Sequence, residues 1–263
     1  MASSVKRILM LHGYAQNASI FYKKMSAIRK AGSKSCEFVF LDAPIILEAG
    51  DFPSDPRTLD STAVPSQADP ELTPRAWWRA NENRTTYYGI EDTLAYVKDY
   101  MAKQETPFHA VMGFSQGACM AALLTVLLER PLEFYPFPFT KTSSNEPVHP
   151  PFKTSIFVSG FAVVPEPYSS LFSPNCVGTI TKCLHVIGTN DVIVSNARSQ
   201  SLVAACVPEN SRVQKHDGGH FVPSKLSWRN FFAHFLEADD PFSISAPPAP
   251  PDAAHEDMAR GVL

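Results

Sequence analysis

The sequence predicts a single α/β domain in which a mostly parallel, doubly wound sheet is flanked by helices. Short apolar runs recur along the chain without polar alternation, as in strands that are covered on both faces. Between these runs, apolar residues recur at helical spacing. The chain has 263 residues, 44% of them hydrophobic and 19% charged, which is enough for one large domain with its own core. Repeated strand–helix alternation favours a parallel sheet with right-handed crossovers.

Six segments are expected to form the strands. Most of them are continuous apolar runs, which is typical of central rather than edge positions in a parallel sheet. In chain order the segments are Ile8–Leu11, Phe38–Leu41, Ala110–Met112, Ser155–Val158, Leu184–Ile187 and Arg212–His216.

Four helices are expected between and after these strands. One of them, Gln116–Leu128, is apolar almost all round, which predicts a central, buried helix. The other three show an apolar face, and Ser195 is a candidate N-cap for the second of them. Their apolar positions are Ile90, Leu94, Val97 and Met101; Leu202, Val203 and Cys206; and Trp228, Phe231, Phe232 and Phe235.

Three segments interrupt the alternation within and after a domain expected to span residues 1–240. Gly50–Pro74 is rich in Pro, Asp, Ser and Thr and is expected to be a surface excursion that supplies a lid over the active site. Pro131–Pro151 carries six prolines interleaved with aromatic residues, which are expected to pack against the body or form a homodimer contact. Pro241–Leu263 is Pro- and Ala-rich and is expected to be a disordered tail. The aromatic residues of the insert are Phe134, Tyr135, Phe137 and Phe139.

Composition excludes several classes of protein. A net charge of −3 offers no broad basic surface, so nucleic acid is not an expected partner. No stretch approaches the ~20 apolar residues of a membrane span, and the N-terminus lacks the apolar stretch of a signal peptide. Five cysteines without a C-x-x-C pair predict free thiols in a reducing, cytoplasmic setting. The eight histidines show no metal-binding spacing, so no metal is expected.

Gly113-Phe-Ser-Gln-Gly117 matches the G-x-S-x-G pattern of a nucleophile elbow. The pattern alone is a weak signal, and an ordinary strand-to-helix turn is the alternative interpretation. Here, however, the motif follows one predicted strand and begins the long apolar helix, which is the context that an elbow requires. Two glycines allow a sharp turn that exposes the Ser115 hydroxyl, and the backbone N–H of Gln116 then points to the same place.

Three further sites follow in the chain order of an α/β-hydrolase. Tyr14, after the first strand, could offer a backbone N–H to an oxyanion, although His12-Gly13 also suits a plain turn. Asp191 follows the fifth strand and is the candidate acid, with a turn cap as the alternative. His220 follows the last strand, after two glycines that let it reach Ser115.

Taken together, these motifs resemble the FSH family of serine hydrolases, over about Lys6 to Glu237. The resemblance implies an α/β-hydrolase fold, a cytosolic location and a Ser115–Asp191–His220 triad that hydrolyses carboxylic esters or acyl thioesters without a cofactor. The motifs that carry it are His12-Gly-Tyr-Ala-Gln-Asn, Leu41-Asp-Ala-Pro, Arg75-Ala-Trp-Trp, Gly113-Phe-Ser-Gln-Gly-Ala, Ser159-Gly-Phe and Gly218-Gly-His-Phe-Val-Pro.

The expected substrate is a small acyl ester of short to medium chain length. An acyl thioester on CoA or a carrier protein is the second alternative, since few basic residues flank Ser115 and His220 in the sequence. A non-catalytic receptor or scaffold with the same fold is the third. Trp78, Phe161 and Phe221 are candidates to line the substrate pocket, although the favoured alternative for Trp78 is a core anchor beneath the excursion.

Overall fold

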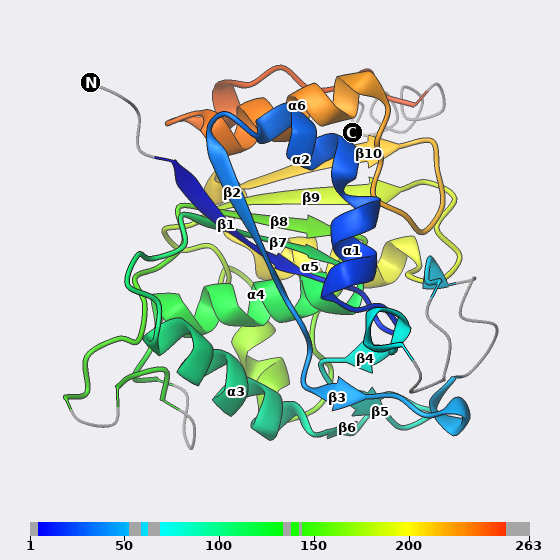
Figure 1. Ribbon diagram of the computed structural model, residues 1–263. Coiled ribbons are helices and arrows are strands. Elements are labelled where there is room, and N and C mark those ends of the chain that lie inside the picture. The colour runs from blue at the N-terminus through cyan, green and yellow to red at the C-terminus, as the bar shows by residue number, and fades with distance from the viewer. Residues whose placement is uncertain (1–4, 53–58, 63–68, 134–137, 142–143, 251–263) are drawn as a thin grey trace, which may run out of the picture.

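The computed structural model describes residues 5–52, 59–62, 69–133, 138–141 and 144–250. Six parallel strands form its central sheet, in the order β10-β9-β8-β7-β1-β2 (Figure 1). All six were predicted from the apolar runs. Their bounds are β1 Lys6–Leu11, β2 Cys36–Leu41, β7 Ala110–Phe114, β8 Thr154–Val158, β9 Lys182–Gly188 and β10 Ser211–His216.

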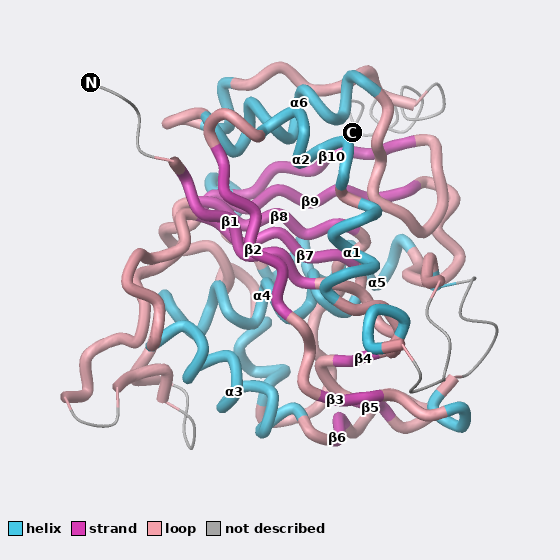
Figure 2. The backbone as a smooth tube through the Cα atoms, in the orientation of Figure 1, coloured by secondary structure: helices cyan, strands magenta, loops and turns pink. Residues whose placement is uncertain are grey.

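Helices cover both faces of this sheet (Figure 2). Helices α3 (Ile90–Ala102), α4 (Gln116–Glu129) and α5 (Asn196–Ala205) pack on one face. The other face is covered by α1 (Ala18–Lys24), α2 (Ser26–Gly32) and α6 (Leu226–Glu237). The three-layer α/β-hydrolase architecture predicted from the sequence is therefore present, and no helix in the described ranges is long and apolar enough to cross a membrane.

The layers explain why the strands are continuous apolar runs. In β1, Leu9 and Leu11 contact the α3–α4–α5 layer, whereas Ile8 and Met10 contact the α1–α2–α6 layer. All four side chains are 0% exposed. Because successive side chains of a strand point to opposite faces, a strand with two covered faces needs apolar residues at every position.

Short elements complete the fold around the carboxyl end of the sheet. Strand β3 (Ile45–Ile46) pairs with β4 (Arg75–Ala76), and β5 (Arg79–Ala80) pairs with β6 (Tyr87–Tyr88), both antiparallel. The turns of 3-10 helix are η1 Ala49–Asp51, η3 Pro70–Leu72, η4 Tyr168–Phe172, η5 Pro208–Asn210 and η6 Pro241–Ser243.

The described part of the insert at 131–151 packs against the body. Phe139 is 1% exposed and belongs to the same apolar cluster as α3 and α4. A β-bridge between Thr140 and Pro147 closes the loop, and the ammonium group of Lys98 on α3 donates to the Pro138 carbonyl at 2.9 Å. The other three aromatic residues of the insert, at positions 134, 135 and 137, lie outside the described residues.

The expectation of a disordered tail from Pro241 is wrong for residues 241–250. Phe242 and Ile244 pack against the apolar cluster beneath α6. The guanidinium of Arg212 on β10 donates to the carbonyl oxygens of Phe242 and Ile244, at 3.3 and 2.6 Å. The Pro- and Ala-rich composition of the segment predicts disorder, but Phe242 and Ile244 are two apolar residues within it that pack against the core and hold the segment in place. Residues 251–263 lie outside the described part of the chain.

Candidate active site

The candidate site lies where the winding of the sheet changes direction. From β1 the chain proceeds to β2 on one side, and from β7 it proceeds to β8 on the other. The helices that follow β1 and β7 therefore lie on opposite faces and leave a crevice at the carboxyl ends of these two strands. Ser115 directly follows β7, and Tyr14 is the third residue after β1.

Ser115 occupies a strained turn between β7 and α4. Its backbone has φ 53° and ψ −117°, a left-handed conformation that non-glycine residues rarely adopt outside functional turns. A Cβ on Gly113 would lie 2.1 Å from the carbonyl oxygen of Gly117, and one on Gly117 would lie 2.2 Å from that of Leu11. Both positions therefore need glycine so that α4 can begin against β1.

A continuous hydrogen-bonded chain links the three predicted triad residues. His220 Nε2 lies 3.0 Å from Ser115 Oγ, and His220 Nδ1 lies 2.8 Å from Asp191 Oδ2. The side chains of His220 and Asp191 are only 4% and 2% exposed. Because the carboxylate can only accept, the Nδ1–H of His220 donates to it, and Nε2 is left to accept from the Ser115 hydroxyl.

Asp191 is held in an ionised and fixed state. Burial acts to raise the pKa of this carboxyl, but the hydrogen bond and charge of His220 and the N–H of Val194 outweigh burial, so the pKa lies below its ordinary value. The other carboxylate oxygen, Oδ1, accepts from the N–H groups of Ile193 and Val194 at 3.0 and 2.9 Å. Asp191 thus caps its own loop and orients His220 at the same time.

The two candidate oxyanion donors lie beside the same cavity as Ser115. Tyr14 and Gln116 both line it. Within the described ranges, no hydrogen bond occupies the backbone N–H of either residue. The N–H of Gln116 also lies at the N-terminus of α4, where the helix dipole favours negative charge. The Tyr14 hydroxyl donates to the Asp51 carbonyl at 2.7 Å, which anchors this loop.

Sequence reasoning gave the Gln116 side chain no role, although it connects the elbow to the wall of the cavity. Its Oε1 accepts from the N–H of Trp77 at 2.9 Å, and its Nε2 donates to the carbonyl of Trp78 at 2.8 Å. These two bonds therefore fix the turn at Ser115 to the segment between β4 and β5, which carries Trp78. The only sign of this role in the sequence is that a residue with an amide side chain directly follows Ser115.

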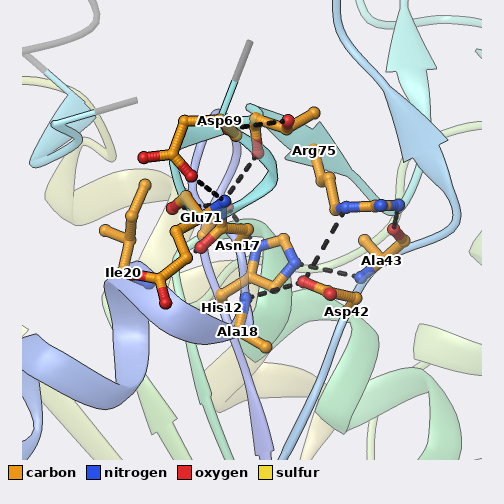
Figure 3. Close-up of polar contacts among 11 residues, drawn as sticks. His12, Asn17, Ala18, Ile20, Asp42, Ala43, Asp69, Glu71 and Arg75 are labelled. Carbon is orange, nitrogen blue, oxygen red and sulfur yellow. Dashed lines mark hydrogen bonds and ion pairs between the residues drawn. The ribbon is translucent and has the colours of Figure 1, made fainter. Parts of the chain in front are cut away.

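His12, for which the sequence suggests no more than a turn, is fully buried beside the site and hydrogen-bonded to the backbone around it. Its Nδ1–H donates to the Gly13 carbonyl at 2.8 Å, and its Nε2 accepts from the N–H of Ala43 at 3.0 Å (Figure 3). Burial is the main reason that its pKa falls to about 4, so the ring is neutral. The His12 carbonyl accepts from the indole N–H of Trp77 at 2.9 Å.

The network in Figure 3 continues from His12 to the end of the excursion. Asn17 caps α1 by accepting from the N–H of Ile20, and its amide donates to the carbonyls of Glu71 and Thr73, both at 2.9 Å. The Arg75 guanidinium donates to the Ala43 carbonyl at 3.0 Å. These bonds fasten the loop that carries Tyr14 to the segments on either side.

Ser115 borders a cavity of about 410 Å³, a volume within the range of small-molecule sites. Trp78 and Phe161, both predicted to line a pocket, lie in its wall. Trp78 is 2% exposed and stacks on Tyr87 with ring centroids 4.8 Å apart. Trp77, in contrast, is 0% exposed and packs against His12 in the core.

The expectation that Phe221 lines the pocket is wrong. Its side chain is 43% exposed, is not part of the cavity wall, and packs with its ring 5.3 Å from that of His216. The reason is the turn at Gly218, where a Cβ would lie 2.2 Å from the Phe221 ring. The same glycine turn that brings His220 to Ser115 therefore sends Phe221 back over β10.

Two cations at the cavity were also missed. Arg84, between β5 and β6, and Arg198, on α5, both line it. No local pattern marks either residue, because only the fold brings positions 84 and 198 to Ser115. Across the described residues, no group of three or more His, Cys, Asp or Glu side chains is arranged to hold a metal ion.

Several known proteins are similar to this chain. The zebrafish protein "Esterase OVCA2" is 31% identical over 246 residues, which cover 90% of this chain and 99% of that protein. The Drosophila melanogaster protein "Esterase CG5412" is 30% identical over 88% of this chain and 73% of its own length. A fission yeast protein named "Dihydrofolate reductase" is also 30% identical over 230 residues, but the chain spans only 46% of that relative.

Solved structures share the fold at low sequence identity. The crystal structure of esterase PE8 has a TM-score of 0.58 at 18% identity and covers 89% of this chain and 93% of its own. Acyl-protein thioesterase 2 from Zea mays has a TM-score of 0.52 at 14% identity, over 84% and 89% of the two chains. The profile of the serine hydrolase family FSH1 matches residues 1–232. By its sequence, then, the chain belongs to the FSH1 family of serine hydrolases.

Proposed function

We propose that this serine hydrolase cleaves short- to medium-chain carboxylic acyl esters through a Ser115–His220–Asp191 triad and an acyl-enzyme. The observation that carries the proposal is the unbroken hydrogen-bonded chain from Ser115 Oγ through His220 to Asp191, at an elbow beside a largely apolar cavity. The two esterases among the relatives support ester substrates.

In the proposed mechanism, His220 Nε2 takes the proton of the Ser115 hydroxyl as Oγ attacks the acyl carbon. Asp191, ionised and acceptor-only, stabilises the imidazolium that forms and keeps Nδ1 protonated. His220 then protonates the leaving alcohol. A water activated by the same ring attacks the acyl-enzyme and releases the acid.

The tetrahedral intermediates carry a negative oxygen that needs hydrogen-bond donors. We assign this role to the backbone N–H groups of Tyr14 and Gln116, which are unoccupied and border the cavity. One such donor typically supplies on the order of 3 kcal/mol of transition-state stabilisation. Buried hydrogen bonds hold the segments that carry both donors: the N–H of Gly13, next to Tyr14, donates to the Gln16 side chain, and the Gln116 side chain accepts from the N–H of Trp77. The donors therefore need no reorganisation during the reaction.

An acyl thioester on CoA or a carrier protein is the second candidate substrate. The same triad cleaves esters and thioesters, and the maize structure that shares the fold is named a thioesterase. The observation that favours this candidate is the pair of arginines at the cavity, Arg84 and Arg198, which could meet a phosphate.

The excursion at 50–74 is the proposed lid over the site. Gly50, Asp51, Phe52 and Leu59 all contribute to the cavity wall. The proposed cellular setting is a reducing compartment such as the cytoplasm, because the five cysteines are free.

A fluorophosphonate probe tests the proposal. Wild type is expected to be labelled and Ser115→Ala is not, whereas Ser227→Ala, on the exposed face of α6, serves as the matched control and is labelled like wild type. A folded wild type that is neither labelled nor active on esters would instead indicate a receptor or scaffold. Asp191→Asn should lower kcat by roughly 10⁴-fold, because it favours the wrong tautomer of His220. Near-full activity of that variant would contradict the assignment of the acid.

A further inference from the structure

Two guanidinium groups border the cavity that contains Ser115. Arg198 projects from α5, and its guanidinium carbon lies 4.0 Å from the centre of the Phe161 ring in the cavity wall. Arg84 comes from the turn between β5 and β6, on the exposed rim, where its own backbone is left-handed with φ 56°. The two side chains come from different parts of the chain and meet only at this cavity.

Neither arginine has a carboxylate partner among the residues that the structure describes. Within the described ranges, no Asp or Glu oxygen lies within 4 Å of either guanidinium. Of the two acidic residues in the cavity wall, Asp51 is already paired with Arg79 at 2.9 Å, and Glu82 lies exposed on the rim. Among the described residues, the only hydrogen bond of the Arg198 side chain is a long one, 3.4 Å to the carbonyl of Ile193.

This arrangement is electrostatically costly in the absence of an anion. Burial, followed by the positive charge of Arg84, lowers the pKa of Arg198 from its ordinary value. A partly buried cation beside a second cation is stabilised when an anion binds both. Proteins retain such unpaired, convergent arginines where they bind carboxylate or phosphate groups.

The position of Arg198 leaves its donors available. A guanidinium that stacks on an aromatic ring uses its face for the ring and keeps its N–H groups at the edge for hydrogen bonds. Phe161 therefore orients Arg198 without satisfying it. The same ring contributes to the apolar wall, so an acyl chain along that wall passes from Ser115 towards the cation.

We propose that the substrate is an acyl ester or thioester that carries an anionic group, and that Arg198, assisted by Arg84, binds this anion while the acyl carbon lies at Ser115. The inference rests on the proposed function and narrows its substrate class. The shared chemistry is an oxyanion with two acceptor oxygens. Its source is either a carboxylate at the far end of the acyl chain or a phosphate on the leaving group.

Matched substrate pairs test the two sources. For a carboxylate, mono-4-nitrophenyl adipate is compared with 4-nitrophenyl hexanoate; for a phosphate, hexanoyl-CoA is compared with the hexanoyl thioester of N-acetylcysteamine. The readout is the ratio of kcat/KM for the anionic and the neutral member of each pair. In wild type we expect this ratio to exceed about 10 in one pair, because a charged hydrogen bond changes binding by about 10- to 100-fold. The pair that shows the preference identifies the source of the anion.

Substitutions assign the preference to the arginines. Arg198→Gln should lower the ratio in that pair by about 10- to 100-fold. Arg198→Lys should keep part of the preference, since it retains the charge but not the fork of donors, and Arg84→Gln should cause a smaller loss because Arg84 is exposed. Arg29→Gln is the matched control: Arg29 also stacks on an aromatic ring, Tyr22 at 3.3 Å, but is not part of the cavity wall. It should leave the ratio unchanged.

A ratio near one in both pairs, or a ratio that Arg198→Gln does not alter, would overturn the inference and leave the serine hydrolase proposal standing. Failure of the hydrolase proposal looks different, since wild type would neither hydrolyse any of the four substrates nor react with a fluorophosphonate. If wild type is labelled but cleaves none of the four, protection against labelling decides. Adipate or CoA should slow the labelling of wild type and not that of Arg198→Gln, and equal labelling rates would overturn the inference.

Discussion

His12 illustrates how a single buried residue makes the stability of this fold depend on pH. Both of its ring nitrogens are hydrogen-bonded to backbone groups, and its pKa is lowered to about 4, mainly by burial. In the unfolded chain the same ring has an ordinary pKa of about 6.5. Below pH 6.5 the unfolded chain therefore takes up a proton that the folded chain does not accept until the pH approaches 4.

The free energy of unfolding should consequently decrease as the pH falls from 6.5 to 4. The contribution of His12 to this decrease is about 3 kcal/mol, and above pH 6.5 its contribution is constant. Urea unfolding at a series of pH values between 7.5 and 4.5 measures the effect.

His12→Gln keeps an acceptor for the N–H of Ala43 but does not titrate, so its stability should vary less steeply over the same range. Burial also lowers the pKa values of His149 and His216, which leaves a smaller dependence in the variant. Parallel curves for the variant and wild type would show that His12 is not the source.

At this scale, the sequence was sufficient to place Ser115, Asp191 and His220 at one edge of the sheet, because each follows a predicted strand within four residues. It was insufficient for Arg84 and Arg198, since both lie in segments whose path depends on tertiary packing. The prediction for Phe221 was wrong because the chain reverses at Gly218, so Phe221 packs against His216 although it is next to His220 in the sequence.

At the junction of β1, β7 and α4, the backbones approach so closely that a side chain does not fit at Gly117. In Gly117→Ala, the new methyl group would lie 2.2 Å from the Leu11 carbonyl oxygen and 2.4 Å from that of His12. Backbone atoms cannot rotate away as a side chain can, so α4 must separate from β1. We expect a loss of about 3 kcal/mol or more in the free energy of unfolding, measured by urea denaturation.

Gly50→Ala provides the comparison for this variant. Apart from its chain neighbours, no heavy atom of the described residues lies within 4 Å of a Cβ at Gly50, so the free energy of unfolding should hardly change. If both variants were equally stable, the close approach of α4 to β1 would not be a requirement of the fold.

The insert offers a second prediction at the level of elements. Phe139 is 1% exposed against the α3–α4 layer, so Phe139→Ala should lower the free energy of unfolding by about 3–5 kcal/mol. Leu132→Ala, in the same insert but with a side chain 68% exposed, should cost little. Equal effects in thermal or urea unfolding would contradict the packing role of the insert.

Elements were predictable where their pattern was long or continuous. The six strands and the helices α3, α4, α5 and α6 have such patterns. Helices α1 and α2 have only seven residues each, and strands β3 to β6 have two, so their sequences hold too few periods to indicate a structure.

For the molecule as a whole, residues 241–250, which follow α6, shield part of the apolar core from solvent. A chain that ends at Asp240 loses the apolar contacts of Phe242 and Ile244 and both hydrogen bonds of Arg212. We expect it to be less stable than the full chain by about 2–3 kcal/mol in urea unfolding. A chain that ends at Pro250 keeps every described contact and should match the full chain; equal stability of the two truncated chains would refute the role of this segment.

The residues of the proposed triad and those that line the rest of the cavity come from separate parts of the molecule. The triad residues follow β7, β9 and β10, which belong to one rigid sheet, whereas Trp78, Arg84 and Phe52 reach the cavity from the excursion and the small antiparallel strands. The first set could be predicted from the sequence, since parallel strands fix where their ends meet. Of the second set, only Trp78 was predicted to line the cavity, because loops do not fix where their side chains meet.

The pairing of β1 with β7 also sets an order in time. Ile8 lies opposite Ala110, so β1 has no neighbour on that side during synthesis until about a hundred further residues have followed. At roughly 5–20 residues per second, this interval is on the order of ten seconds. During it, β1 and β2 present an apolar, unpaired edge, and long-range pairing of this kind is slow to form even in a released chain. The edge that will adjoin the strand leading to Ser115 is therefore a part of the nascent protein that needs protection from aggregation during synthesis.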